Sequence, residues 1–210
     1  AVAGDGLDRT PIALWRHHPV HDATAEGLAA AVTAFQADLD LDMVKVTPAS
    51  GYPAEAWGAT LEPDDNAEGT RRYVRRVVTQ PADWHALAPL SADEGVFARE
   101  LDALTRVRAA VGPSVHVFAT IFSPLTIAKQ MAGPAVLEHV RTCPDDLLAG
   151  LAVIAETNAR FARACVARGA DGVFFATQFA RSTLMDIATY RRFGLPYDLP
   201  VVEAARGAGA

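Results

Sequence analysis

Residues 11–19 read Pro-Ile-Ala-Leu-Trp-Arg-His-His-Pro, a short apolar run that ends in basic and titratable side chains. An apolar run bounded by prolines is typical of a strand buried on both faces, as in a parallel sheet. We therefore predict a first strand over 11–16. Ligands of α/β folds bind at the carboxyl ends of such strands, which predicts a site at Arg16, His17 and His18. Each of them alone is explained equally well as a solvated strand end, but three together favour a site.

Three further apolar runs predict strands over 43–47, 115–121 and 170–178, and segments with helical spacing separate them. Alternating strands and helices indicate parallel βαβ units with right-handed crossovers. An open doubly wound sheet and part of a (β/α)8 barrel both satisfy this pattern. No glycine-rich phosphate loop follows a strand, which argues against the first, and four strands cannot close a barrel.

Two local features complete the predicted fold. The region around the polar turn 63–69 predicts a hairpin-like excursion from the sheet, with the basic run 71–76 as an exposed strand whose charges lie in water. Residues 91–94 have the spacing of a capping box at a helix start, and Ser182 is predicted to begin another helix. The predicted fold class is α/β, with about four parallel strands in one domain over 1–210.

Composition excludes several classes of function. The chain has 210 residues, half of them hydrophobic, with a net charge of −6, so it has no general basic face for nucleic acid or an anionic membrane. The chain has two cysteines that are far apart in the sequence. This pattern indicates neither a disulfide framework nor a cysteine-based zinc site. Free thiols and the absence of an apolar spanning run or signal segment predict a cytoplasmic protein.

Lys45 is unexpected in an apolar strand. Val44 and Val46 share one face of the predicted strand, and Lys45 shares the other with Thr47. Two explanations stay open: a buried lysine held by an acidic partner, or a lysine that binds substrate.

Other candidate binding residues lie in the loops that follow the strands. The loop 49–58 contains Tyr52, Glu55 and a tryptophan. Aromatic residues in a loop that are not needed for core packing often form binding surfaces. Thr177 and Gln178 lie at the tip of the fourth predicted strand. Ser123 follows the third strand, where it can also cap a helix that begins with proline.

Several of these motifs, in chain order, resemble the uroporphyrinogen decarboxylase superfamily. They are residues 11–16, residues 43–46 with the Tyr52, Glu55 and Trp-Gly loop, residues 122–126, and residues 169–176. The superfamily includes the heme-pathway decarboxylase and the corrinoid or coenzyme M methyltransferases, all built on a (β/α)8 barrel. Its members are longer than this chain. The resemblance therefore implies that residues 1–210 form the N-terminal part of a barrel.

The decarboxylase's own catalytic residues carry over poorly. The resemblance matches Arg16 to the first of two arginines that grip substrate carboxylates, but Val20 stands at the second position. Gln130 stands where the decarboxylase has its active-site tyrosine, and its essential aspartate after the second strand has no equivalent. The loop with Tyr52 and Glu55 is more similar to the methyltransferase branch.

For that branch, the resemblance implies a zinc site made by a His-x-Cys pair and a later cysteine in the second half of the barrel. None of these ligands falls within 1–210, so residues 1–210 alone are expected to bind no metal or cofactor. Zinc would lower the pKa of a thiol that attacks a methyl group held on cobalt. The partners implied are a small-molecule substrate, a corrinoid protein and a second copy of the chain in a homodimer.

Three functions follow from the sequence. The first is a methyltransferase-like enzyme with Arg16 and His17 as catalytic residues, and with substrate bound by His18, Lys45, Tyr52, Glu55, Ser123, Thr177 and Gln178. The second is a cofactor-free uroporphyrinogen decarboxylase. The third is a non-catalytic binding protein on a degenerate barrel.

Overall fold

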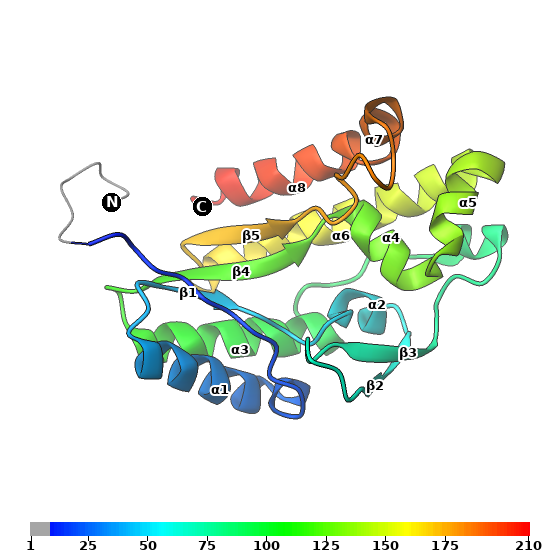
Figure 1. Ribbon diagram of the computed structural model, residues 1–210. Helices are drawn as coiled ribbons and strands as arrows, with labels where there is room; N and C mark the ends of the chain where they lie inside the picture. The colour runs from blue at the N-terminus through cyan, green and yellow to red at the C-terminus, as the bar shows by residue number, and fades with distance from the viewer. Residues whose placement is uncertain (1–8) are drawn as a thin grey trace.

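The computed structural model describes residues 9–210 and is built around three parallel strands. These are β1 (Met43–Val46), β4 (His116–Phe122) and β5 (Gly172–Ala176), in the order β1-β4-β5 (Figure 1). The register places Val46 opposite Ala119, and Ile121 opposite Phe175. β1 and β5 fall within predicted apolar runs, and β4 ends one residue beyond its predicted run, so the central sheet confirms that part of the prediction.

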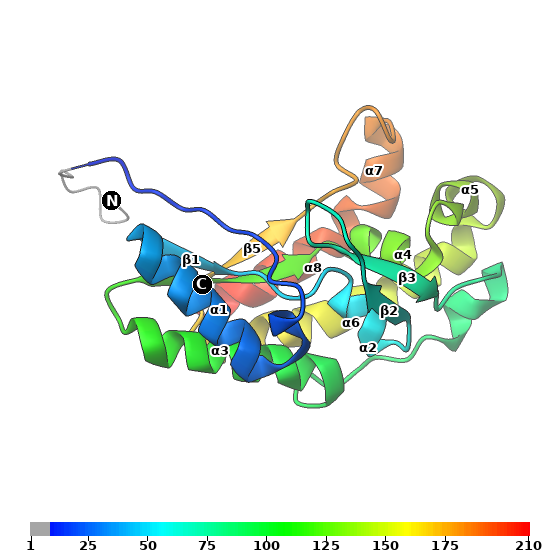
Figure 2. The same ribbon diagram turned by 60° about the horizontal axis from the view of Figure 1, so that its bottom comes forward.

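Long helices cover one face of the sheet. On β1 and β4, every second side chain points to this face, and these side chains are buried aliphatic ones. Val44, Val46, Val117 and Ile121 are each almost fully buried there. The helices on this face are α1 (Ala25–Leu39), α3 (Gly95–Val111), α6 (Pro144–Ala167) and α8 (Leu195–Gly207). Figure 2 shows α1 and α3 lying side by side. We call this side of the sheet the outer face and the opposite side the inner face.

Shorter elements gather near the carboxyl ends of the strands. They are η1 (His21–Ala23), α2 (Tyr52–Ala56), β2 (Thr60–Pro63), β3 (Arg71–Arg75), η2 (Pro81–Ala86), α4 (Pro124–Ala132), α5 (Ala135–Thr142) and α7 (Ile187–Phe193). The antiparallel pair β2-β3 is the predicted excursion from the main sheet. Ser123 caps α4 by accepting a hydrogen bond from the Thr126 amide. No helix within residues 9–210 is long and apolar enough to cross a membrane.

The prediction of a fourth parallel strand over 11–16 is wrong. This segment runs past β1 but forms no ladder of backbone hydrogen bonds with it. Its Ile12 carbonyl accepts one backbone bond, from the amide of Asp42, just before β1, at 3.1 Å. The Ile12 amide instead donates to the Asp42 carboxylate at 2.7 Å, and Pro11 has no amide to offer. Apolar residues predict an extended backbone, but they do not specify a partner for its hydrogen bonds.

Three smaller predictions are corrected. Arg71 does not lie in water, because it pairs with the fully buried Asp22 carboxylate. The capping box is not at residues 91–94 but in η2, where Gln80 and Asp83 exchange side-chain and backbone bonds. The helix expected from Ser182 begins only at Ile187, because the Asp186 carboxylate caps it by accepting from the Thr189 amide.

Candidate functional site

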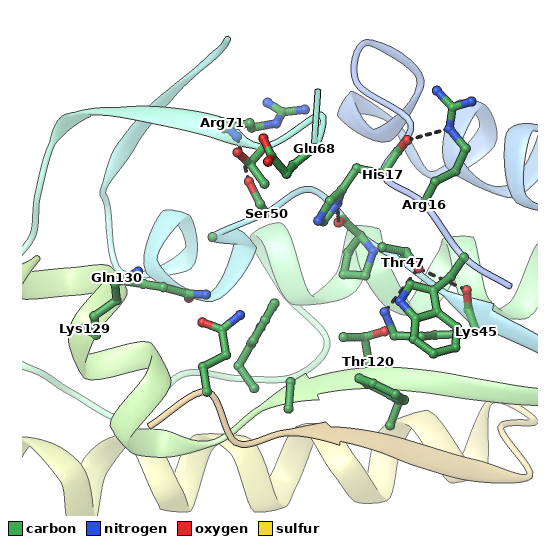
Figure 3. Close-up of a pocket in the computed structure, with 18 of the residues that line it drawn as sticks. Arg16, His17, Lys45, Thr47, Ser50, Glu68, Arg71, Thr120, Lys129 and Gln130 are labelled. Carbon is green, nitrogen blue, oxygen red and sulfur yellow. Dashed lines mark hydrogen bonds between the residues drawn. The ribbon is translucent and has the colours of Figure 1, made fainter. Parts of the chain in front are cut away.

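A cavity of about 680 Å³ lies on the inner face, at the carboxyl ends of the strands (Figure 3). The alternation that turns Val44 and Val46 outward turns Lys45 and Thr47 into this cavity. Its remaining walls come from residues 15–17, the β2-β3 hairpin, α4 and the tip of β5. Among the residues that line the cavity are Trp15, Arg16, His17, Lys45, Thr47, Ser50, Glu68, Arg71, Thr120, Lys129, Gln130, Phe174 and Gln178.

Positive charge predominates in the cavity. Arg16, Lys45 and Lys129 line it without a salt bridge to any carboxylate among residues 9–210. Glu68 is the carboxylate among the lining residues, and Arg71 is already neutralised by Asp22, which lies behind it. A concave site with more cations than anions concentrates negatively charged ligands. The cavity is therefore suited to a small anion.

Lys45 lies between two aromatic rings. Its ammonium is 4.5 Å from the centre of the Phe174 ring and 5.1 Å from that of Trp15. Burial lowers the pKa of Lys45 to about 8. The acidic partner considered from the sequence is not present among residues 9–210, and the rings on either side shield the amine from water without supplying a negative charge.

His17 is held in one tautomer by the backbone. Its Nδ1 lies 3.1 Å from the Pro48 carbonyl oxygen, which can only accept, so the Nδ1 nitrogen carries the hydrogen. Burial and the nearby Lys45 charge lower the pKa of His17 below its usual value. The neutral ring therefore has Nε2 free as a proton acceptor.

The structure brings four of the predicted site residues together and places the other five elsewhere. Arg16, His17, Lys45 and Gln178 all line the cavity. The other five are not among the residues that line it. The side chains of two of them are held by contacts with other residues of the chain. Tyr52 is buried in the core and donates to the Thr120 carbonyl at 2.9 Å. Glu55 forms a bidentate ion pair with Arg99 at 3.1 and 3.2 Å.

The remaining three also have local roles. The His18 ring packs edge-on against the Phe35 ring, with 5.9 Å between the two ring centres. Ser123 caps α4, and Thr177 lies in the turn after β5, where its carbonyl accepts from the Ala180 amide. None of the three is among the residues that line the cavity.

Residues 7–210 match the family model described as uroporphyrinogen decarboxylase (URO-D). The chain belongs to the URO-D family. Two curated relatives are methylcobamide:CoM methyltransferases MtbA, from Methanosarcina acetivorans (23% identical) and Methanosarcina mazei (24% identical). Each match extends over 188 residues, which is 90% of this chain and 55% of the relative. The URO-D chain thus spans about half the length of the curated relatives it matches.

A solved structure gives the same fold. A methyltransferase from Methanosarcina mazei superposes with a TM-score of 0.75 at 20% identity, covering 91% of this chain and 61% of the other. The fold is therefore that of a partial (β/α)8 barrel, as the sequence predicts, with three parallel strands in the described part rather than four.

The zinc implied by the methyltransferase branch has no ligand set in the described part of the URO-D chain. Among residues 9–210, no three His, Cys, Asp or Glu side chains lie close enough to hold a metal ion. The side chains of the cavity wall can bind an anion or move a proton, but they do not form a metal site.

The resemblance matched Gln130 to the decarboxylase's active-site tyrosine, but Gln130 was not among the predicted binding residues. Its side chain is 93% buried, and its Oε1 oxygen has no hydrogen-bond partner within the described residues, although the side chain lines the cavity (Figure 3). A signal was available, since steps of three and four residues from Ser123 through Thr126 to Gln130 follow one side of a helix. Arg71 was also missed, because its place depends on how the hairpin folds back on the sheet.

Proposed function

We propose that this URO-D chain is the N-terminal part of a methyltransferase-like enzyme, which transfers a methyl group from a corrinoid protein to a thiol or a related small molecule. Residues 1–210 would form the anion-binding part of the barrel. The observation that carries the proposal is the cation-rich cavity at the carboxyl ends of β1 and β5, in a chain whose curated relatives are methylcobamide:CoM methyltransferases.

Arg16 and His17 would act at the mouth of the cavity. The exposed Arg16 guanidinium pairs with an anionic group of the substrate and orients it. Neutral His17, with Nε2 free, accepts a proton from the group that becomes methylated. Lys45 and Lys129 add to the positive potential, and Gln178 and Gln130 offer amide groups to the polar part of the substrate.

The decarboxylase alternative has less support in the structure. The Val20 side chain, at the position of the second carboxylate-gripping arginine, is 74% exposed and lies outside the cavity. Gln130, at the position of the active-site tyrosine, carries no acidic hydroxyl. A porphyrinogen with many carboxylates needs several fixed cations. Valine at position 20 removes one of them.

Activity of protein expressed from the complete gene that contains this segment tests the proposal. We expect thiol-dependent demethylation of methylcobalamin, followed by the change in cobalamin absorbance. Release of carbon dioxide from uroporphyrinogen would instead support the decarboxylase. Neither activity in a folded protein that binds small anions would support a non-catalytic binding protein.

A charge variant locates the anion site. Arg16→Gln removes a charge-assisted contact of about 1.5 kcal/mol, so KM for the anionic substrate should rise about tenfold. Arg206→Gln, which removes an exposed cation from α8, is the matched control and should leave KM unchanged. Equal KM values in the two variants would contradict the assignment of Arg16.

A further inference from the structure

Lysine is rare in this chain and is confined to the cavity. Only two of its 19 basic side chains are lysines, and the other 17 are arginines. Both lysines, Lys45 and Lys129, line the cavity. Their surroundings differ, because Lys129 is exposed on α4 and Lys45 is half-buried on the inner face of β1. The chain therefore has two side-chain amines in one cavity, with contrasting environments.

The surroundings of Lys45 disfavour its charged form. Two aromatic rings flank the amine, and the Thr47 hydroxyl, 3.4 Å from Nζ, is its hydrogen-bond partner. No carboxylate oxygen among residues 9–210 lies within 4.0 Å of it. The neighbouring His17 adds no negative charge. A desolvated lysine without a counterion loses its proton more readily, and the neutral amine is a nucleophile.

We propose that Lys45 is a reactive amine that captures the aldehyde or keto group of a small anionic molecule as a reversible Schiff base. The neutral Nζ attacks the carbonyl carbon to form the C–N bond of a carbinolamine. Protons then pass from nitrogen to the hydroxyl oxygen, which leaves as water, and the C=N bond of the imine forms. No oxidant, reductant or metal takes part in this step.

The cavity explains both parts of the ligand class. Its volume of about 680 Å³ lies within the range of small-molecule sites. Arg16, from the segment before η1, and Lys129, from α4, both line the cavity and provide charges for an anionic group, and Thr47 lies where it can pass a proton to the departing water. The apolar rings of Trp15 and Phe174 limit the access of water to the imine. The proposal depends on this geometry and not on methyl transfer.

Trapping with pyridoxal 5′-phosphate, an aldehyde that carries a phosphate, tests the proposal in the intact protein. The imine is reduced with borohydride, and the labelled lysine is located by mass spectrometry of peptides. At about pH 7.5 a far larger fraction of Lys45 than of an ordinary lysine is neutral, so Lys45 should be labelled at least about tenfold faster than Lys129. Equal labelling, faster labelling of Lys129, or no labelling would overturn the proposal.

Two variants and a second probe test separately the amine, the aromatic surroundings and the anionic group of the ligand. Lys45→Arg keeps the positive charge but removes the nucleophile, so labelling should fall to that of Lys129. Phe174→Ala keeps the amine but admits water, and it should slow the labelling of Lys45 severalfold. Pyridoxal without phosphate should react severalfold more slowly with Lys45, and an equal rate would overturn the anionic part of the ligand class. If a variant does not fold, the comparison of Lys45 with Lys129 in the unaltered protein still decides.

Discussion

The outer and inner faces of the central sheet are built from the same strands but differ in chemistry. On β4, Val117 and Ile121 point outward and are completely buried under helices, whereas Thr120 and Phe122 point inward and line the cavity. On β1, Val46 lies in the apolar layer and its neighbour Lys45 lies in the cavity. Because side chains alternate along a strand, neighbouring residues contribute either to the stability of the core or to the wall of the cavity. Substitutions on the two faces should differ in the same way.

The largest expected effect is an exception to this separation, because the buried Arg71–Asp22 ion pair stabilises the fold although Arg71 lines the cavity. Arg71→Met leaves the fully buried Asp22 carboxylate without its partner, which should lower the free energy of unfolding by about 4 kcal/mol. The next residue provides the control, because Arg72 pairs with Glu62 in solvent, and Arg72→Met should cost less than about 1 kcal/mol. Urea denaturation measures both. Equal losses would show that the Arg71–Asp22 pair is not effectively buried.

A cavity in the outer face should have the next largest effect. Ile121→Ala removes three carbons from a fully buried side chain and should cost about 3 kcal/mol, against about 1 kcal/mol for Ile121→Val. The folded variants should label Lys45 at the normal rate, because Ile121 faces away from the cavity. A change in labelling without a change in the free energy of unfolding would contradict the separation of the faces.

A carboxyl group within the outer layer sharpens the comparison. Glu100 is buried and accepts from Arg99 at 2.8 Å, but its Oε2 oxygen has no partner within the described residues. Burial raises the pKa of Glu100 to about 7. The folded protein then keeps a proton that the unfolded chain releases, so the free energy of unfolding should fall as pH rises from about 4.5 to about 7.

The Glu100→Gln variant should lack this loss, which is on the order of 2 kcal/mol between about pH 5 and pH 8. Chemical denaturation at several pH values measures it. Glu156→Gln, on the exposed side of α6, should keep the slope of the unaltered protein. If Glu100→Gln keeps that slope too, the pH dependence comes from another group.

The smallest effect tests the link between the two faces. The Tyr52 hydroxyl crosses the layer to the Thr120 carbonyl, and Tyr52→Phe should cost about 1 kcal/mol. Tyr73→Phe is the control, because the Tyr73 hydroxyl makes no hydrogen bond within residues 9–210. It should change the free energy of unfolding by less than about 0.5 kcal/mol.

Much of the sheet could be predicted because its strands are short apolar runs whose position in the chain is local information. The segment 11–16 has the same composition but forms no strand, since strand pairing depends on residues far away in the sequence. The Asp42 carboxylate takes the Ile12 amide, a contact 30 residues distant that no local pattern indicates. Two helix starts were misplaced, because the Ser91 hydroxyl accepts from the Asp93 amide in the turn before α3, and because Asp186 rather than Ser182 caps α7.

The cavity was predicted in part. Gln178 follows from the rule that ligands bind where parallel strands end, and Lys45 follows from strand alternation. Arg16 lines the cavity although the strand from which it was predicted does not form. Tyr52 was misplaced because a short helix turns its ring into the core, where the carbonyl of a residue 68 positions away satisfies its hydroxyl. Arg71 and Gln130 reach the cavity only through the packing of the hairpin and α4 against the sheet.

The position of Trp15 makes the cavity optically observable without a label. Trp15 is 49% exposed beside Lys45 and Phe174, whereas Trp84 is almost fully buried and donates its indole hydrogen to His139. A soluble collisional quencher would therefore reach Trp15 and leave the emission of Trp84 unquenched, while the partly exposed Trp57, outside the cavity lining, would add a background that a cavity ligand does not change. A ligand that fills the cavity would shield Trp15 from the quencher, so its occupancy could be followed from the intrinsic fluorescence of the protein alone.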